Sequence, residues 1–580
     1  MLLRARNHML LWLVLVAASL MPVGEPALVN GPTLVASQVD YEPVVVWDTC
    51  PFPLPRGETE GVTIDCGYLI VPQDRAEPGG VEVELAVAIL YSTGPTPAPD
   101  PILYLEGGPG GSALTGVDAW AVSVLRTDRD IILIDQRGTG YSWPWLTCYE
   151  VDEIEDELGE AAALTACRQR LAADGIDVSD YNSANSAKDV ADLRVALEID
   201  EWNLVGISYG TRLALTIMRD YPEGVRSVIL DSAYPPVVDA YEQQAVASTR
   251  VFNKLFTDCA TDPACSAAYP DLEGTFYRVL DALDADPLDD PDLDGLYYGG
   301  DLVMFMFDLF YDANTVPYMP RMIAELDQGE TATFLDLYWG ELPPYTGDSA
   351  VGDDLAFRFV DEFFWLSDDF DDATYNALWD DLYALDADLT GLDGIIDTYF
   401  EPESADYLLN LLYSMDLNDR SRLGVMLFVD DVSDADGMFN AVECNEEVPF
   451  NDLSETREIA ATLPTAISEV DVEIFVDMLD TCAAWNAGVA ADVEDDAVYS
   501  DIPTLVLAGA YDPVTPPEWG MIAVSTLSNG YFFLFPAEGH SVLETSPCAD
   551  SIVLSFLDAP LSTPDATCLM TLDGITFETQ

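Results

Sequence analysis

Short apolar runs alternate with amphipathic segments between about residues 60 and 235. Five of these runs have the length and the apolar or alternating pattern of β-strands: 81–91, 101–105, 130–135, 202–207 and 227–230. Residues 186–199 and 211–219 carry apolar side chains at the three- to four-residue spacing of a helix. Strands that alternate with helices predict a parallel α/β sheet.

The pattern changes over residues 237–495, where long helical segments rich in Leu, Phe, Tyr and Asp replace the alternation. Strand-like runs return at 504–508 and 531–535. We therefore expect one α/β domain, formed by residues 37–236 and 496–580, that is interrupted by a large, mainly helical insertion.

The first 36 residues have the layout of a secretory signal peptide. Arg4 and Arg6 precede an apolar run over residues 9–21, which is too short to span a bilayer. No later stretch reaches 18 apolar residues without a charge. We therefore expect a secreted protein with no membrane span once the signal peptide is removed.

Charge excludes some classes of partner. The chain has 22 Lys and Arg against 105 Asp and Glu, a formal net charge of −83, while 49% of its residues are hydrophobic. The hydrophobic fraction is large enough for a folded core. A surface this negative repels phosphate backbones and anionic lipid, so nucleic acid is excluded as a partner.

The ten cysteines fall as five pairs of sequence neighbours: Cys50 and Cys66, Cys148 and Cys167, Cys259 and Cys265, Cys444 and Cys482, and Cys548 and Cys568. We expect five local disulfides, as in exported proteins, although the spacing alone allows other pairings. A zinc site is the alternative, but no pair has C-x-x-C spacing and histidine is nearly absent.

An aspartate-rich segment at residues 290–295, with Asp301 at the twelfth position, matches much of a calcium-binding EF-hand loop. Pro287 breaks the helix that should precede such a loop, and so many aspartates produce this pattern by chance. We expect a solvated turn here, and neither a metal ion nor another cofactor.

Residues 206–210, Gly-Ile-Ser-Tyr-Gly, join an expected strand to an expected helix. A serine in this context sits on a sharp turn with its hydroxyl exposed, and the two glycines leave room for close backbone approach. We therefore identify Ser208 as the candidate nucleophile, with an ordinary turn as the alternative.

The histidine count indicates the partner of Ser208. The chain has two histidines, His8 and His540, and the first lies within the expected signal peptide. His540 is then the imidazole that can accept the serine proton near pH 7. Asp512 follows the expected strand 504–508 and precedes His540 by 28 residues, a position from which it can orient the imidazole.

Residues 106–111, Glu-Gly-Gly-Pro-Gly-Gly, follow the buried strand 101–105. Glycines here let backbone N–H groups face a substrate carbonyl, so we assign the oxyanion hole to the amides of Gly108 and Tyr209. A phosphate-binding loop is the alternative, but the Lys-Ser/Thr ending of a P-loop is missing.

Five motifs together resemble the prolyl aminopeptidase and tripeptidyl aminopeptidase branch of the α/β-hydrolases. They are the residues 106–111, 135–142 (Asp-Gln-Arg-Gly-Thr-Gly-Tyr-Ser), 206–210, 512–515 and 539–540. The resemblance implies an α/β-hydrolase fold with a large, mainly helical cap inserted in the catalytic domain. It also implies the triad order Ser208, Asp512, His540. The chain departs from prolyl aminopeptidases at Glu106, where they carry histidine before Gly-Gly-Pro-Gly.

The triad and the resemblance predict a secreted serine hydrolase. We expect an aminopeptidase that releases residues or short peptides from substrates with a free N-terminus, through an acyl-enzyme on Ser208. A carboxylesterase or lipase with the same triad is one alternative, and a catalytically silent binding protein on this scaffold is another. Glu106 is placed to bind the substrate ammonium or to support the glycine loop by hydrogen bonding. Glu446 and Glu447 are weaker candidates for the ammonium, and we expect them to be surface charge instead.

Overall fold

The structure, a computed structural model, describes most of the chain after the expected signal peptide. The described residues are 41–151, 159–290, 293, 295–343, 355–367, 370, 372–382, 385, 389–415, 420, 423, 427 and 432–579. Residues 1–36, which include His8, lie outside them, as do Asp292 and Asp294 of the calcium-loop pattern.

Among the described residues, nine strands form one sheet in the order β1-β2-β3-β5-β4-β6-β7-β8-β9. The strands are β1 (Val44–Asp48), β2 (Ile64–Pro72), β3 (Glu82–Leu90), β4 (Ile102–Leu105), β5 (Ile131–Ile134), β6 (Trp202–Ile207), β7 (Val225–Asp231), β8 (Thr504–Gly509) and β9 (Gly530–Phe535). Within the first four strands in this order, β1, β2, β3 and β5, every neighbouring pair is antiparallel. From β5 onward, through β4, β6, β7, β8 and β9, every neighbouring pair is parallel. The α/β expectation is confirmed, but the sheet is mixed rather than parallel throughout.

The helix expected at 186–199 begins and ends three residues earlier, as α4 (Ser183–Ala196). The side chain of Asn182 accepts a hydrogen bond from the Asn185 N–H and so caps the helix before the predicted start. The apolar spacing therefore predicted the helix correctly, but it did not predict Asn182 as the N-cap residue.

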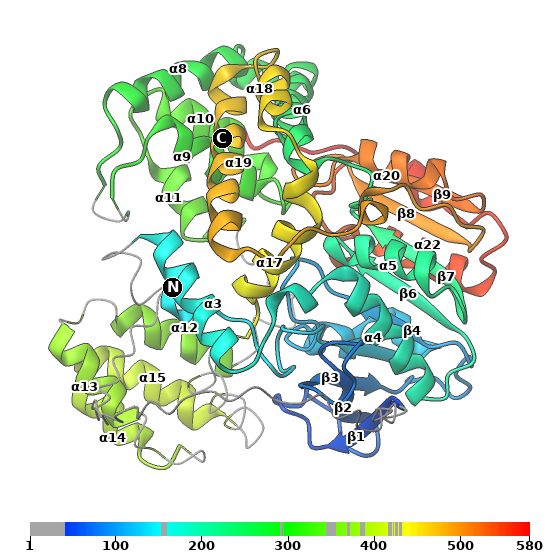
Figure 1. The fold of residues 1–580 in the computed structure, drawn as a ribbon. Coiled ribbons are helices and arrows are strands. Elements are labelled where there is room, and N and C mark those ends of the chain that lie inside the picture. The colour runs from blue at the N-terminus through cyan, green and yellow to red at the C-terminus, as the bar shows by residue number, and fades with distance from the viewer. Residues whose placement is uncertain are drawn as a thin grey trace, which may run out of the picture.

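Helices cover both faces of the sheet (Figure 1). Leu103 and Leu105 of β4 lie in the core with α4 and α5 (Tyr209–Asp220). Ile102 and Tyr104 lie in the opposite core with α1 (Val117–Val122) and α22 (Pro547–Asp558). All four residues of β4 are therefore buried, as its uninterrupted apolar sequence predicts.

The cap lies between β7 and β8 and, in its described part, contains no strand. Its helices are α6 (Ala240–Thr261), α7 (Pro263–Ala268), α8 (Leu272–Ala285), α9 (Gly299–Leu309), α10 (Met319–Leu326), α11 (Ala332–Tyr338), α12 (Leu355–Ser367), α13 (Asp372–Leu382), α14 (Leu392–Tyr399), α15 (Pro402–Ser414), α17 (Asp436–Val442), α18 (Leu453–Ala460) and α19 (Thr465–Trp485). Phe252, Phe276 and Phe310 lie in one apolar core of the cap, whereas Phe359 and Phe363 lie in another. Figure 1 shows the corresponding helix groups, α8 to α11 and α12 to α15, as separate clusters beside the sheet domain.

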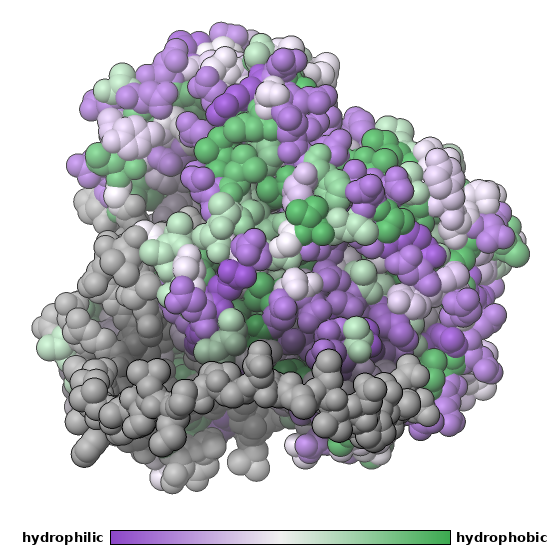
Figure 2. Space-filling model, viewed as in Figure 1, coloured by the Kyte–Doolittle hydropathy of each residue, from purple (hydrophilic) through white to green (hydrophobic). Residues whose placement is uncertain are grey.

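The five expected cysteine pairs are the disulfides of the described chain. Asp301, from the calcium-loop pattern, caps α9 instead, because its carboxylate accepts the Tyr298 N–H at 2.7 Å. No described helix combines the length and the apolar character that a bilayer span requires. Hydrophilic residues cover much of the face drawn in Figure 2, and hydrophobic residues gather near α19.

Gly210→Ala tests the close packing at the start of α5. A β-carbon on Gly210 would overlap the Leu105 carbonyl and lie 2.9 Å from the Glu106 carbonyl oxygen, and neither backbone can easily yield. We expect Gly210→Ala to destabilise the fold by at least about 1–3 kcal/mol, measured as a lower midpoint of thermal unfolding. Gly300→Ala in α9 is the control, because the nearest atom to its β-carbon is 4.0 Å away and the change should stay below about 1 kcal/mol. Equal losses in the two variants would contradict this packing argument.

Candidate active site

Ser208 links β6 to α5 with φ 52° and ψ −124°, a conformation that is strained for a residue with a side chain. A β-carbon on Gly206 would clash with the Gly210 carbonyl, and one on Gly210 would clash with the Leu105 carbonyl, so the turn needs both glycines. Ser208 is partly exposed, whereas the residues on each side of it are buried. This is the sharp strand-to-helix turn that presents a serine hydroxyl.

Asp512 and His540 lie in the loops that follow β8 and β9, and they are in contact. His540 Nδ1 is 2.9 Å from Asp512 Oδ2, and the Asp512 side chain is fully buried. The Asp512 carboxylate also accepts hydrogen bonds from the Thr515 N–H and hydroxyl, each at 2.8 Å, and from the Val514 N–H at 3.1 Å. With Nδ1 occupied, Nε2 is the imidazole nitrogen that can exchange a proton with a nucleophile.

Asp231, at the end of β7, ties the Ser208 turn to the His540 loop. Its backbone carbonyl accepts the Ser208 N–H at 3.0 Å, and its carboxylate accepts the N–H groups of Val542 at 3.1 Å and Leu543 at 2.7 Å. The structure therefore brings the three predicted triad residues to one edge of the sheet. Asp231 was not among the predicted site residues; its signal in the sequence is a charged residue that ends a buried apolar strand.

Negative charge surrounds the imidazole of His540. Burial lowers the pKa of this imidazole, but the carboxylates of Asp512, Asp231 and Glu544 outweigh burial, so the pKa lies above the ordinary histidine value. Burial raises the pKa of the Asp231 carboxyl to about 7, although two backbone N–H donors oppose that shift. The surroundings therefore favour the imidazolium that forms when His540 accepts a proton.

The glycine loop after β4 lies against the nucleophile. A β-carbon on Gly107 would be 3.0 Å from the Ser208 β-carbon, and Gly108, with φ 103°, is exposed. Among the described residues, the amides of Gly108 and Tyr209 have no hydrogen-bond acceptor, so both are available to an oxyanion.

Glu106 makes two hydrogen bonds at the base of this loop. Its Oε1 accepts the Gly107 N–H at 2.8 Å, and its Oε2 accepts the Tyr104 hydroxyl at 3.0 Å. Burial raises the pKa of the Glu106 carboxyl to about 7, although both hydrogen bonds lower it. These contacts favour the loop-supporting role over ammonium binding.

Glu446 and Glu447 are buried, so the expectation of surface charge for them is wrong. They lie in a π-helical turn, η4 (Glu443–Glu447), and their side chains are 1% and 2% exposed. Arg212 donates to Glu447 Oε2 at 2.7 Å and to the Glu446 backbone carbonyl at 3.0 Å. The backbone N–H of Ala240 donates to Glu447 Oε1 at 2.6 Å. Hydrogen bonds from Arg212 and Ala240, which are distant in sequence, offset the cost of burying this turn. The spacing of residues in the sequence does not reveal such contacts.

Glu443, in the same turn, is a buried carboxyl group that was not among the predicted site residues. Its Oε2 accepts the Tyr241 hydroxyl at 2.9 Å. Burial, with Glu447 beside it, raises the pKa of the Glu443 carboxyl to about 8. The only sequence signal is the density of glutamate around Cys444, which the acidic composition hides.

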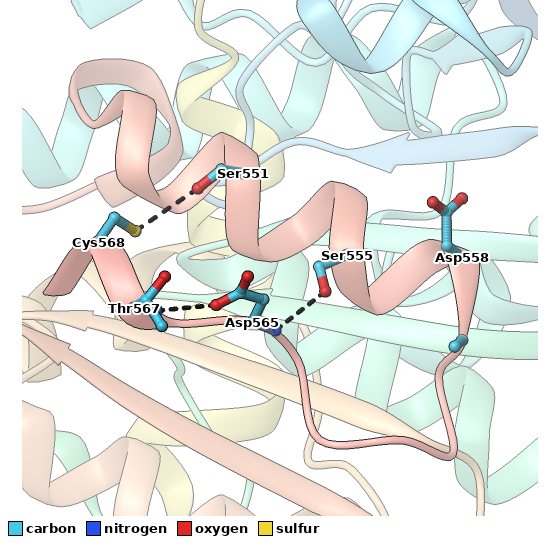
Figure 3. A pocket seen from close by; sticks show the side chains of 7 residues that line it. Ser551, Ser555, Asp558, Asp565, Thr567 and Cys568 are labelled. Atoms are coloured by element: carbon cyan, nitrogen blue, oxygen red, sulfur yellow. Dashed lines mark hydrogen bonds between the residues drawn. The ribbon is translucent and has the colours of Figure 1, made fainter.

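A surface pocket of about 460 Å³ lies elsewhere (Figure 3). It is lined by Ser551, Ser555, Asp558, Ala559, Asp565, Thr567 and Cys568. Leu557, at the same end of α22, accepts hydrogen bonds from Arg129 and Arg226, which precede β5 and begin β7. That end of the pocket therefore lies at the amino ends of the strands, opposite the edge that carries Ser208.

Two known families match the chain. Residues 100–316 match the family described as alpha/beta hydrolase fold, and residues 472–568 match the family described as TAP-like protein. The first match includes the Ser208 turn and the second includes Asp512 and His540.

Curated relatives are similar over part of the chain. Serine protease Hip1 of Mycobacterium tuberculosis is 30% identical over 311 residues, which cover 49% of this chain and 57% of that protein. Carboxylesterase B of the same organism is 30% identical over 51% of this chain and 62% of its own length. Tripeptidyl aminopeptidase of Streptomyces lividans is 31% identical over 31% of this chain and 37% of its own length. The chain thus spans less than two thirds of each of these relatives.

Among solved structures, proline iminopeptidase of Mycobacterium smegmatis is 13% identical, with a TM-score of 0.34. The alignment covers 85% of this chain and 98% of that one.

Asp512→Asn tests the acid–base pair. Loss of the carboxylate charge that raises the His540 pKa should move the acidic limb of the pH profile of kcat/KM to lower pH. We expect kcat to fall by about 10⁴-fold, because asparagine does not hold the imidazole in the required tautomer. Asp558→Asn, whose carboxylate is 76% exposed, is the control and should leave both quantities unchanged. An unshifted acidic limb in Asp512→Asn would contradict the pairing as the source of the pKa shift.

Proposed function

The chain belongs to the α/β-hydrolase superfamily, in its tripeptidyl-aminopeptidase-like branch, and from that premise we propose that it is a secreted serine aminopeptidase. The contact between His540 and Asp512 beside the strained Ser208 turn carries the proposal. Export is supported by the five disulfides, which form in oxidising compartments.

The proposed reaction is acyl transfer to Ser208. His540 Nε2 accepts the hydroxyl proton as Ser208 Oγ attacks the substrate carbonyl, and the amides of Gly108 and Tyr209 stabilise the oxyanion. The imidazolium then gives its proton to the leaving amine. His540 then accepts a proton from water as the water attacks the acyl-enzyme, and the imidazolium returns that proton to Ser208 Oγ as the acid leaves.

The acidic turn η4 supports recognition of a substrate ammonium. Arg212 lies four residues after Ser208, one turn along α5, and it pairs with Glu447. Three carboxylates of this turn therefore share one guanidinium, and Glu443 has only a tyrosine hydroxyl as its hydrogen-bond donor among the described residues. An ammonium group beside Glu443 would lower the raised pKa of its carboxyl and pair with the resulting carboxylate, in a site where charged hydrogen bonds are strong.

Ester hydrolysis is the second candidate, because the relative named Carboxylesterase B is as similar to this chain as the named protease. The same triad and oxyanion donors would serve it. The two candidates differ in whether the enzyme requires a free amino group.

Ser208→Ala tests catalysis by this site. We expect kcat to fall by about 10⁶-fold and labelling by a fluorophosphonate probe to disappear, because the nucleophile is lost. The assay uses aminoacyl, dipeptidyl and tripeptidyl amides, both free and N-acetylated, beside short-chain esters. Ser555→Ala, in the remote pocket, is the matched control and should retain full activity. More than a few per cent of activity in Ser208→Ala would reject the assignment, and absence of labelling in the unchanged enzyme would indicate a silent binding protein.

Glu443→Gln and Glu106→Gln form a pair that locates the ammonium site. We expect Glu443→Gln to raise KM for free-amine peptides by about one to two orders of magnitude, the effect of a charged hydrogen bond, and to leave ester hydrolysis unchanged. Glu106→Gln should lower activity on amines and esters equally, because its hydrogen bonds support the oxyanion loop. The reverse result, an amine-specific loss in Glu106→Gln alone, would place the ammonium at Glu106.

A further inference from the structure

The cap contacts the loop that carries Asp512. Arg250 of α6 donates through Nη1 to the Ala510 carbonyl at 2.8 Å and through Nη2 to the carbonyl of Asp512 itself. Gln244 of the same helix approaches the Pro513 carbonyl at 3.4 Å. One face of α6 therefore follows the backbone of this loop over four residues.

The cap also contacts the loop that carries His540. The His540 N–H donates to the Tyr311 carbonyl at 3.0 Å, and the Tyr311 ring meets the imidazole edge-on, with ring centroids 5.1 Å apart. A β-carbon on Gly539 would clash with the Tyr311 carbonyl, so this loop fits tightly against the segment after α9. The cap therefore contacts both the loop of Asp512 and the loop of His540.

The bonds of Arg250 are directed mainly at backbone carbonyls. Its nearest carboxylate oxygen, on Glu518, is 3.8 Å from Nε, and the Glu518 side chain is 57% exposed. Two N–H groups of a planar fork hold two carbonyls at a fixed separation, which a lysine ammonium cannot reproduce with the same geometry. The arrangement therefore restricts the loop backbone rather than neutralising the Asp512 carboxylate directly.

We propose that Arg250 is a positioning residue of the acid–base pair: from the cap, it fixes the Asp512 loop so that the carboxylate stays aligned with His540. This inference rests on the proposed function, because it assumes that Asp512 and His540 act together on Ser208. It makes the cap a working part of the catalytic geometry in addition to a cover for the substrate.

The pH profile distinguishes positioning from a simple charge effect. The charged groups that face His540 are the carboxylates of Asp512, Asp231 and Glu544, with the Tyr311 ring against the imidazole. If Arg250 acted only as a nearby positive charge, its removal would strengthen their field and raise the pKa of the imidazole. If Arg250 aligns Asp512, its removal weakens the contact that raises this pKa, so the pKa falls.

Arg250→Met is the direct test. We expect kcat to fall by about 10- to 100-fold, the effect of a misplacement of around 1 Å, with KM nearly unchanged. The acidic limb of kcat/KM should move to lower pH. Arg278→Met, on the exposed cap helix α8, is the matched control and should leave kcat and the pH profile unchanged. An acidic limb that stays in place or moves to higher pH in a folded Arg250→Met protein would overturn the proposal.

Arg250→Lys keeps the inference testable if the methionine variant does not fold. It retains the charge but loses the fork, so we expect a smaller fall in kcat and a shift of the acidic limb in the same direction. A lysine variant with the full activity and pH profile of the unchanged enzyme would overturn the positioning role. Ser208→Ala, measured in parallel, distinguishes failure of the proposed function from failure of this inference. Residual activity in Ser208→Ala would reject the proposed function. If Ser208→Ala is inactive but Arg250→Lys keeps the pH profile of the unchanged enzyme, only the positioning role of Arg250 is rejected.

Discussion

The parallel pairing of β7 with β8 joins two parts of the chain that the cap separates in sequence. Val228 pairs with Thr504 and Asp231 pairs with Leu507, so the strand beside the nucleophile turn lies next to the strand that leads to the acid loop. Because these strands are parallel, their carboxyl ends meet at one edge of the sheet. A shift of this register by one residue would turn the side chains to the opposite face and separate the candidate site.

Local pattern was sufficient to predict β4 and β6, because both are short, mainly apolar runs that alternate with helical segments, although Asn203 interrupts the run of β6. A count of histidines was sufficient to select His540, and the expected disulfides needed only sequence proximity. The antiparallel strands β1 and β2 were both missed: β1 is a run of only five residues at the edge of the sheet, and Asp65, Cys66 and Gly67 interrupt the apolar pattern of β2. Glu447 was misread as surface charge because its partner Arg212 is 235 residues away, and among 105 acidic residues no single one stands out.

The few cations of this acidic chain include several that are buried and paired. Among the described residues, the fully buried arginines are Arg126, Arg137 and Arg212. Each donates to a carboxylate at 2.6–2.7 Å, and each also binds backbone carbonyls. Loss of one partner in such a pair leaves a buried charge unpaired, which lowers the free energy of unfolding by about 3–5 kcal/mol.

The position of the cap in the chain has a consequence for biosynthesis. Ribosomes deliver the amino-terminal part first, so Ser208 emerges before the cap, and Asp512 and His540 emerge after it. A nascent chain that ends anywhere within the cap carries a nucleophile without the aspartate or the imidazole of the pair. In the proposed mechanism such a chain lacks the base that accepts the serine proton, so the activity would arise only once β8 and β9 have joined the sheet.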